Sequence, residues 1–123
     1  DNFKVIENIG EIDNLKNNIK VDIFIRINTN FSNKGCTKKE AYDIINYANR
    51  NNLRIRGISL DSGGIHNSKN AYLSSFFYTE PLLYYLTHMN KEKPILDIGC
   101  YNNKDFEWIK YIPYEIIALP KSK

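Results

Sequence analysis

The sequence of 123 residues has little of several residue types that mark particular classes of protein. It contains one methionine, one tryptophan, two histidines and two cysteines. Cys36 and Cys100 have no metal-binding spacing, and two cysteines cannot build the disulfide framework of a small secreted domain. We therefore expect two reduced thiols in a cytoplasmic protein, with no metal site.

Long apolar runs and concentrated positive charge are also missing. No segment approaches the roughly 20 apolar residues that a membrane-spanning helix needs, and no signal peptide is visible. Seventeen basic and fourteen acidic residues give a formal charge of +3, and the lysines are spread along the chain. A nucleic-acid-binding protein usually shows a basic stripe with stacking aromatics. The composition therefore argues against both a membrane protein and a nucleic-acid partner.

What is present is an alternation of strand-like and helix-like segments, which predicts a single α/β domain over residues 1–123. β-branched and aromatic residues predict five strands, at Phe3 to Ile6, Val21 to Ile27, Leu53 to Leu60, Pro94 to Ile98 and Glu115 to Ala118. Between them we expect helices at Glu11 to Asn18, 38–50, Asn70 to Met89 and Asp105 to Tyr111. Strands separated by helices favour parallel pairing with right-handed crossovers. The expected fold is a small parallel sheet of four or five strands flanked by helices, either a partial β/α barrel or an open sheet.

The second helix carries the clearest local signals. Thr37 and Glu40 have the spacing of a capping box, in which the hydroxyl and the carboxylate satisfy backbone N–H groups at the start of a helix. The apolar residues that follow lie at helical spacing, at Ala41, Ile44, Ile45 and Ala48. Asn51-Asn52 is expected to end this helix.

The third helix is rich in aromatic residues. We expect its core residues to be Leu73, Phe76, Phe77 and Leu83. Pro81 lies inside it and should kink the helix or split it in two, because proline removes a donor and clashes with the preceding turn. The tyrosines of this helix, such as Tyr72, Tyr84 and Tyr85, suit core and half-buried positions, and they would also suit a protein–protein interface, where tyrosine is enriched.

In parallel α/β folds, ligands gather at the carboxyl ends of the strands. Here these ends are Asn28 to Gly35, Asp61 to His66, Gly99 to Asn103 and Leu119 to Lys123. A paired-carboxylate site at Asp61 and Asp97 is conceivable, but we expect Asp97 to hold the turn that follows it. His66, in a polar loop, is expected to be solvated.

Five short segments occur together in an order and spacing that resembles a known family. They are Arg26-Ile27, Lys34-Gly35, Gly57-Ile58-Ser59-Leu60, Leu96-Asp97-Ile98-Gly99 and Ile116-Ile117-Ala118-Leu119-Pro120. In that order they resemble the later half of the pyridoxal-phosphate barrel of ornithine and diaminopimelate decarboxylases, with alanine racemase as a more distant relative. The resemblance implies a β/α barrel fold and, in a complete relative, a pyridoxal phosphate cofactor.

The sequence departs from this family at the positions that hold the cofactor. Asp61 and Gly64 stand where decarboxylases have a histidine that stacks on the ring and a serine that holds the phosphate, and Gly63 lies between them. The glycine-rich phosphate turn reads Gly99-Cys100-Tyr101, whose side chains block close approach of the backbone. Leu119 replaces the glutamate that pairs with the pyridine nitrogen, so the electron sink would be lost.

The remaining charges do not restore that site. Lys121 lies near the position of the family's phosphate-binding arginine, but it lacks the planar fork of arginine. The family's Schiff-base lysine lies on an earlier strand that this sequence does not contain. The degenerate ligand face therefore consists of seven candidate residues, Asp61, Gly63, Gly64, Gly99, Cys100, Tyr101 and Lys121.

Three functions follow, in order of preference. The first is a non-catalytic, decarboxylase-like module that has no cofactor and acts by binding or regulating a protein partner. The second is a fragment of a divergent pyridoxal-phosphate-dependent decarboxylase or racemase. The third is a fragment of an S-adenosylmethionine-dependent methyltransferase, since 94–100 resembles the first motif of that class. That resemblance lacks the usual Gly-x-Gly continuation and the acidic residue that would bind the ribose.

Overall fold

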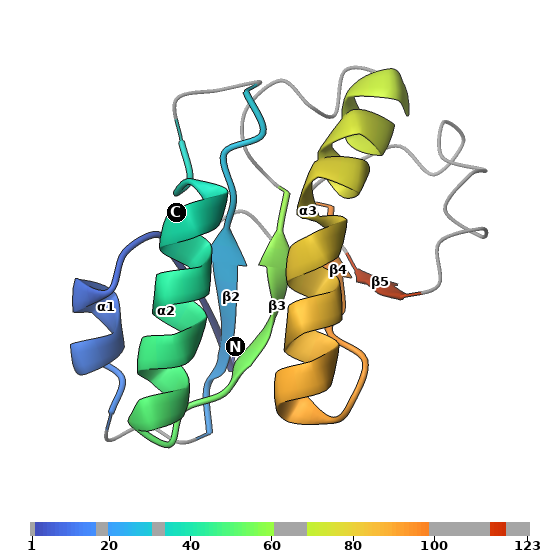
Figure 1. Cartoon of the computed structure of the whole chain (residues 1–123). Helices are drawn as coiled ribbons and strands as arrows, with labels where there is room; N and C mark the ends of the chain where they lie inside the picture. The colour runs from blue at the N-terminus through green and yellow to red at the C-terminus, as the bar shows by residue number, and fades with distance from the viewer. Residues whose placement is uncertain (1, 17–19, 31–33, 61–68, 99–113, 118–123) are drawn as a thin grey trace.

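A computed structural model describes residues 2–16, 20–30, 34–60, 69–98 and 114–117 of the chain (Figure 1). Strands and helices alternate through most of this length, as the sequence predicts. The elements are β1 (Phe3–Ile6), α1 (Gly10–Asp13), β2 (Asp22–Arg26), α2 (Lys38–Arg50), β3 (Ile55–Ser59), α3 (Lys69–Asn90), β4 (Ile95–Asp97) and β5 (Glu115–Ile117).

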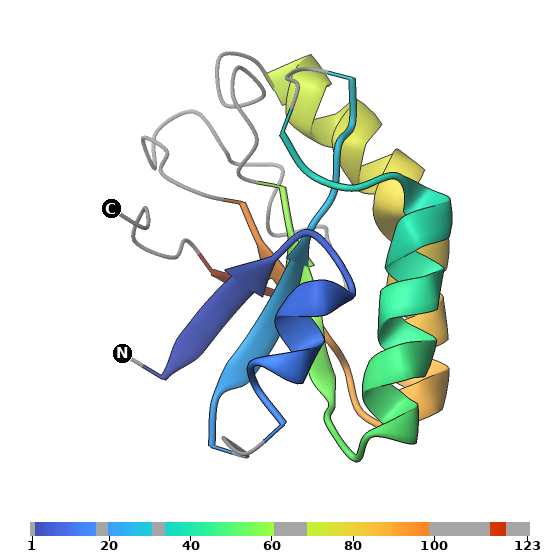
Figure 2. The same cartoon turned by 90° about the vertical axis from the view of Figure 1, so that its left-hand side faces the viewer.

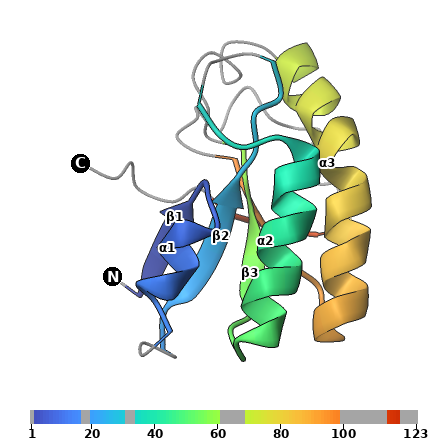
Figure 3. The same cartoon turned by 60° about the vertical axis from the view of Figure 1, so that its left-hand side comes forward.

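The five strands form one sheet in the order β1-β2-β3-β4-β5, and every neighbouring pair is parallel. The three helices lie on the same side of this sheet (Figures 2 and 3). Parallel strands need crossover connections, and right-handed crossovers taken in sequential order place each helix on the same face. The predicted fold class, an open or partial barrel of four or five parallel strands flanked by helices, is confirmed.

The core lies between the sheet and the helices. Ile25 on β2, Ile58 on β3 and Leu96 on β4 are neighbours across the sheet and are fully buried. Side chains on a strand point alternately to its two faces, so these three positions define the helix-covered face. The helices contribute the other layer of the core, through Ile12, Ile44, Ile45, Leu82, Leu83 and Leu86.

Helix α2 forms as its sequence predicts. Thr37 Oγ1 accepts a hydrogen bond from the Glu40 backbone N–H at 3.0 Å, and the Thr37 N–H donates to Glu40 Oε1 at 2.9 Å. Asn52 has a φ of 59°, a left-handed conformation that asparagine tolerates, and the Leu53 N–H then donates to the carbonyl oxygen of Ala48 at 2.8 Å. This last bond closes the carboxyl end of the helix, as in a Schellman motif. The four predicted core residues of α2 are all buried.

Helix α1 is shorter than predicted. It covers only Gly10–Asp13, where the sequence suggested a helix from Glu11 to Asn18, and residues 17–19 lie outside the described part of the chain. Asn8 and Glu11 still begin it with reciprocal bonds, since the Glu11 N–H donates to Asn8 Oδ1 and the Asn8 N–H donates to Glu11 Oε2. Asparagine has low helix propensity, which is consistent with an early end at Asn14.

Helix α3 differs from the prediction at Phe77 and takes one of the two predicted forms at Pro81. Phe77 was expected in the core but is 64% exposed, whereas its neighbour Phe76 is buried. Pro81 does not split the helix, which runs without a break from Lys69 to Asn90. The helix bends, as the prediction of a kink allows, and its amino-terminal part leans relative to the rest in Figures 1 and 2. Thr79 Oγ1 donates to the carbonyl oxygens of Ser75 and Phe76 just before the proline, and such back-bonding is known to bend helices.

The second face of the sheet contains Phe24, which is buried and lies beside Gly57 on the neighbouring strand. A Cβ atom at Gly57 would lie 2.8 Å from Phe24 Cε2 and would collide with the carbonyl oxygen of Ile95. Strand β3 therefore needs glycine here in order to approach β4 and to leave room for the ring.

Other predictions fall partly or wholly outside the described residues. These are the helix at 105–111, Cys100, His66, the side chain of Tyr72 and the last residue of the fifth predicted strand. Within the described ranges, no helix has the length and apolar character needed to cross a membrane.

Candidate functional site at the carboxyl edge of the sheet

The seven residues of the degenerate ligand face all lie outside the described part of the chain, so their roles remain predictions. They are Asp61, Gly63, Gly64, Gly99, Cys100, Tyr101 and Lys121. The strands that lead to them are described, and the carboxyl ends of those strands place four other polar side chains in one line.

These four residues, Glu7, Arg26, Ser59 and Asp97, are here called the polar row. Arg26 is paired in register with Ser59, and Ser59 with Asp97, so the three lie side by side on adjacent strands. Glu7 follows Ile6, the last residue of β1, and extends the line beyond that strand. Because side chains alternate along a strand, the row lies on the same face as Phe24, opposite the helices.

The Ser59 and Asp97 side chains form a buried polar contact in the middle of the row. Ser59 Oγ donates a hydrogen bond to Asp97 Oδ2 at 2.8 Å, and the two residues are 0% and 1% exposed. The backbones are tied as well, since the Leu60 N–H donates to the carbonyl oxygen of Asp97. A buried carboxylate is stable only when it is hydrogen-bonded or paired. Asp97 is thus tied to β3, whereas its predicted roles in holding the following turn and in pairing with Asp61 involve residues outside the described part of the chain and stay predictions.

Arg26 and Glu7 form the other half of the row. Arg26 Nη1 lies 3.8 Å from Glu7 Oε2, and the side chain of Arg26 is only 18% exposed. The other carboxylate oxygen of Glu7 accepts a hydrogen bond from the backbone N–H of Gly35. One carboxylate thus joins the end of β1, the end of β2 and the segment that leads into α2.

The lead-in to α2 is fixed by Gly35, which belongs to the family-like segment Lys34-Gly35. Gly35 has a φ of 94°, and a Cβ there would lie 2.6 Å from the backbone nitrogen of Asn28. Cys36 then pairs with the end of β2, because its N–H donates to the Arg26 carbonyl oxygen and its own carbonyl oxygen accepts from Asn28. The glycine allows the chain to return close to the polar row.

One donor of the row is unused. Arg26 Nε is buried and has no hydrogen-bond partner among the described residues. Such a group can receive an anionic or carbonyl-bearing ligand. The row as a whole nevertheless carries two acidic side chains and one basic one, so it does not form a positively charged site.

Cys36 lies beside the row but is not poised to react. Burial raises the pKa of its thiol to about 12, and the nearby carboxylates of Glu40 and Glu7 act in the same direction. Because the thiolate is the reactive form, Cys36 is a packing residue. Among the described residues, no three side chains of the types that bind metals come close enough to hold an ion.

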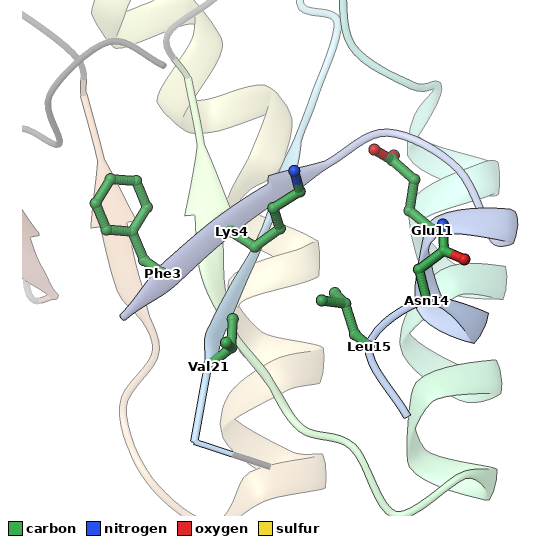
Figure 4. A pocket seen from close by; sticks show the side chains of 6 residues that line it. All are labelled: Phe3, Lys4, Glu11, Asn14, Leu15 and Val21. Atoms are coloured by element: carbon green, nitrogen blue, oxygen red, sulfur yellow. The ribbon is translucent and has the colours of Figure 1, made fainter. Parts of the chain in front are cut away.

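A separate hollow lies between β1 and α1 (Figure 4). It has a volume of about 340 Å³ and is lined by Phe3, Lys4, Glu11, Asn14, Leu15 and Val21. None of these residues belongs to the polar row, and none was predicted as a site residue. We therefore treat it as a feature of the outer edge of the sheet, distinct from the candidate site.

Sequence reasoning did not single out Glu7 or Ser59 as site residues. Both follow the rule that polar residues at the carboxyl ends of parallel strands converge. Ser59 lies in one of the family-like segments, and Glu7 directly follows the first predicted strand. Arg26 was noticed for its resemblance alone.

Comparisons by sequence find no matching family model and no matching curated protein. Comparisons of structure find decarboxylases. The lysine/ornithine decarboxylase of Vibrio vulnificus, complexed with cadaverine, is 26% identical over 80% of this chain with a TM-score of 0.68. Its complex with putrescine gives 28% identity, the same coverage and a TM-score of 0.67. The arginine decarboxylase of Paramecium bursaria Chlorella virus, bound to agmatine, covers 97% of the chain at 18% identity with a TM-score of 0.77.

These similarities confirm the resemblance to decarboxylase barrels that the sequence predicts. The chain spans 26%, 27% and 39% of the length of these three proteins. It therefore corresponds to a part of a decarboxylase barrel, and the activity of those whole proteins does not transfer to it by similarity alone.

Proposed function

We propose that this chain is a decarboxylase-like module that has lost the chemistry of its relatives and acts by binding a protein partner. The observation that carries the proposal is the composition of the face that bears the polar row. Its described strand side chains include no lysine, and those on β2, β3 and β4 are Asp22, Phe24, Arg26, Ser59, Ile95 and Asp97. The described strands of this face therefore offer no amine to an aldehyde cofactor, and covalent binding would need a lysine from elsewhere.

Pyridoxal phosphate does not fit the described residues in other respects either. A phosphate group needs several donors or positive charges, but Arg26 already lies beside the carboxylate of Glu7. Asp97 is buried and bound to Ser59, so it is not presented to a ligand ring. The described part of the face is therefore built for internal contacts between strands rather than for this cofactor.

The sequence beyond the described residues supports the same conclusion. Asp61, Cys100 and Leu119 occupy positions where the family has a stacking histidine, a phosphate-binding glycine and a ring-pairing glutamate. Each replacement removes a different interaction with the cofactor, and leucine in particular cannot stabilise a protonated pyridine nitrogen.

Exposed aromatic side chains of α3, on the opposite side of the sheet from the polar row, support the binding of a protein. Three large aromatic side chains of α3 are exposed, Phe77 by 64%, Tyr84 by 63% and Tyr78 by 37%. Exposed aromatic residues are enriched at protein–protein interfaces, since they bury a large area with little loss of conformational entropy.

The experiment is a titration of the intact polypeptide with pyridoxal phosphate, followed by absorbance in the aldimine band, then borohydride reduction and mass spectrometry. We expect no aldimine band and no pyridoxyl-lysine adduct, while a catalytically active ornithine decarboxylase treated in parallel gives both. An adduct on a single lysine, formed at a stoichiometric ratio, would overturn the proposal.

A second function is favoured by one specific observation. The two structures of the V. vulnificus lysine/ornithine decarboxylase are 26% and 28% identical over 80% of this chain, and they hold the diamines cadaverine and putrescine. The unused Nε donor of Arg26 would then serve a ligand in a longer enzyme that supplies the lysine from elsewhere. Release of carbon dioxide from lysine, ornithine or arginine by the intact polypeptide would establish this alternative.

The methyltransferase alternative receives no support from the fold. A doubly wound sheet reverses its strand order and carries helices on both faces. Here the order is sequential, and the described helices cover one face. Calorimetry with S-adenosylmethionine is expected to show no binding.

A further inference from the structure

A hollow lies beside α3 at the end of the sheet where the strands begin. It has a volume of about 240 Å³ and is lined by Tyr84, Thr87, Lys93 and Tyr114, which are here called the tyrosine hollow. The carboxyl end of α3 and the start of β3 lie at this same end of the molecule (Figure 1). The polar row lies at the carboxyl ends of the strands, so the hollow is separate from it.

Two tyrosine rings form walls of the hollow. The ring centroids of Tyr84 and Tyr114 lie 6.4 Å apart in an edge contact, and Tyr114 also packs on the buried ring of Phe76 at 6.1 Å. Tyr84 is nevertheless 63% exposed. Side chains that are already held lose less entropy on binding than mobile ones. The hollow is smaller than the roughly 300–1,000 Å³ of pockets for small ligands, which favours a single side chain of a partner as its occupant.

Basic residues adjoin the hollow at the starts of β3 and β4. They are Arg54, Arg56, Lys91 and Lys93, here called the basic rim. Arg54 Nη1 and Arg56 Nη1 lie 2.7 Å and 3.3 Å from the same carboxylate oxygen of Glu92, and Arg56 Nη1 also donates to the carbonyl oxygen of Lys93 at 3.1 Å. One carboxylate cannot neutralise four bases. The rim and Glu92 together carry a formal charge of +3, as large as that of the whole chain.

The rim has a fixed place and an excess of charge. The Lys91 N–H donates to the carbonyl oxygen of Thr87 at 2.8 Å, and Asn90 Nδ2 donates to the carbonyl oxygen of the first residue of β3. The dipole of α3 favours a cation after its last turn, which accounts for Lys91. It does not account for Arg54 and Lys93, which precede strands and are exposed. Their charges are available to a partner.

Two acidic residues lie near the hollow but outside the rim. Glu80 is half-buried one turn before Tyr84, on the side away from Lys91 along the helix. Its carboxylate contributes, after burial and Tyr84, to the raised pKa of Tyr114. Glu115 is paired in register with Ile95, and because side chains alternate along a strand, it lies on the sheet face opposite α3.

From these observations we infer that the tyrosine hollow and the basic rim bind an acidic segment of a partner protein. One apolar or aromatic side chain of the segment enters between Tyr84 and Tyr114, and its carboxylates lie beside the rim. Tyrosine and arginine are the residues that most often dominate the energy of an interface, and arginine pairs well with carboxylates. A nucleic acid would need a longer basic stripe with several stacking rings, whereas four bases here adjoin one hollow.

This inference rests on the proposed function for the claim that the chain binds a protein, and it adds the chemistry of the partner. The two fail differently. An aldimine formed by a chain that also binds an acidic peptide would overturn the loss of chemistry alone. A chain that forms no aldimine and binds no acidic peptide would overturn this inference alone.

The test is fluorescence anisotropy of a labelled peptide, with the intact polypeptide as titrant. The peptide has a central phenylalanine flanked by three glutamates on each side. We expect saturable binding that weakens as salt is added. Replacing the glutamates by glutamine, or the phenylalanine by alanine, should each lower the affinity about tenfold or more, because the inference requires both the charges and the ring.

Variants of the chain locate the site. Tyr84→Ala should lower the affinity about tenfold or more, as expected of a central interface residue. Its matched control is Phe77→Ala, since Phe77 lies on the same helix outside the hollow and is 64% exposed. Lys93→Glu should lower the affinity about five- to tenfold. Its control is Lys39→Glu, an equal change of net charge at an exposed residue of α2. Both controls should bind like the unchanged chain, and circular dichroism verifies that all four variants are folded.

Several results would overturn the inference. One is a glutamate peptide that does not bind the unchanged chain. Another is a loss of affinity that Phe77→Ala or Lys39→Glu shares, because the attraction would then come from the helix or the net charge in general. Equal binding of the glutamine peptide, or tighter binding of a single-stranded oligothymidine with the same charge, would also exclude an acidic protein segment as the ligand.

Discussion

At the scale of single residues, Gly57 shows how one missing side chain determines the packing of the sheet. A Cβ at this position would collide with the Ile95 carbonyl oxygen and lie 2.8 Å from the Phe24 ring. We expect Gly57→Ala to lower the free energy of unfolding by about 2–4 kcal/mol, because neither the backbone of β4 nor a buried ring can easily move. Urea denaturation measures this loss.

The matched control for Gly57 is Gly10→Ala. A Cβ at Gly10 would lie 3.3 Å from the side-chain oxygen of Asn8 and meet nothing else nearby. We expect a change of less than about 1 kcal/mol there. An unaltered urea midpoint for Gly57→Ala would mean that β3 and β4 do not approach as closely as described.

The raised pKa of Cys36 gives a prediction about reactivity. In a Cys100→Ser variant, Cys36 is the single thiol, and its pKa of about 12 in the folded chain compares with an ordinary value of 9.0. Its thiolate fraction near pH 8 should therefore be roughly a thousandfold lower in the folded state than in the unfolded state. Reaction with a disulfide reagent should be slow until urea unfolds the chain, and equal rates with and without urea would contradict the burial of Cys36.

The sign of the same shift sets a pH dependence of stability. The folded pKa lies above the unfolded one, so the contribution of the buried thiol is fully present below pH 9.0. It is lost progressively as the pH rises from there toward 12. The unfolding free energy of the Cys100→Ser variant should fall in this window more than that of a variant that also carries Cys36→Ala.

At the scale of secondary-structure elements, α2 was predictable because its signals are local. Thr37, Glu40 and Asn52 each act within a few residues of their own position, and all three do what their sequence context predicts. Helix α3 was less predictable. Phe76 and Phe77 are adjacent, and because the helix is apolar on most sides, its periodicity could not determine which of the two rings faces the core.

The capping box of α2 provides a prediction at this scale. Thr37→Ala should destabilise the chain by about 1 kcal/mol, since it leaves the Glu40 N–H without its acceptor.

The hydrogen bond from the Thr37 backbone is the main cause that lowers the pKa of Glu40 below 4.5. The stabilisation by Glu40 is therefore present above pH 4.5 and is lost as the pH falls through the lower folded value.

Thermal unfolding of the unchanged chain and of Glu40→Gln, compared from neutral to acidic pH, measures this contribution. The difference between the two melting temperatures should shrink as the solution is acidified below pH 4.5. Glu115→Gln is a control on an exposed carboxylate outside α2, and its difference from the unchanged chain should not follow the same course.

At the scale of the whole molecule, the fold was easier to predict than the site because they depend on contacts of different range. The alternation of strands and helices, with the crossover rule, is sufficient for a sequential parallel sheet. The polar row depends on contacts between distant residues. Glu7 meets Gly35 across 28 positions and Ser59 meets Asp97 across 38, and no local pattern indicates such pairs. Only the general convergence of strand ends could have suggested them.

The layout of the sheet predicts a gradient of stability across the molecule. Strands β2 and β3 have paired strands on both sides, whereas β1 is paired only with β2 in the described part of the chain. Ile25 and Ile58, at the centre, are fully buried. Amide hydrogens in β2 and β3 should therefore exchange only through near-global unfolding, and those of β1 should exchange faster through local opening.

Hydrogen exchange followed by mass spectrometry, at peptide resolution, measures this gradient. Exchange in β1 as slow as in β2 would show that another strand covers its outer edge. The sheet would then continue beyond β1, and the described strands would form one part of a larger barrel.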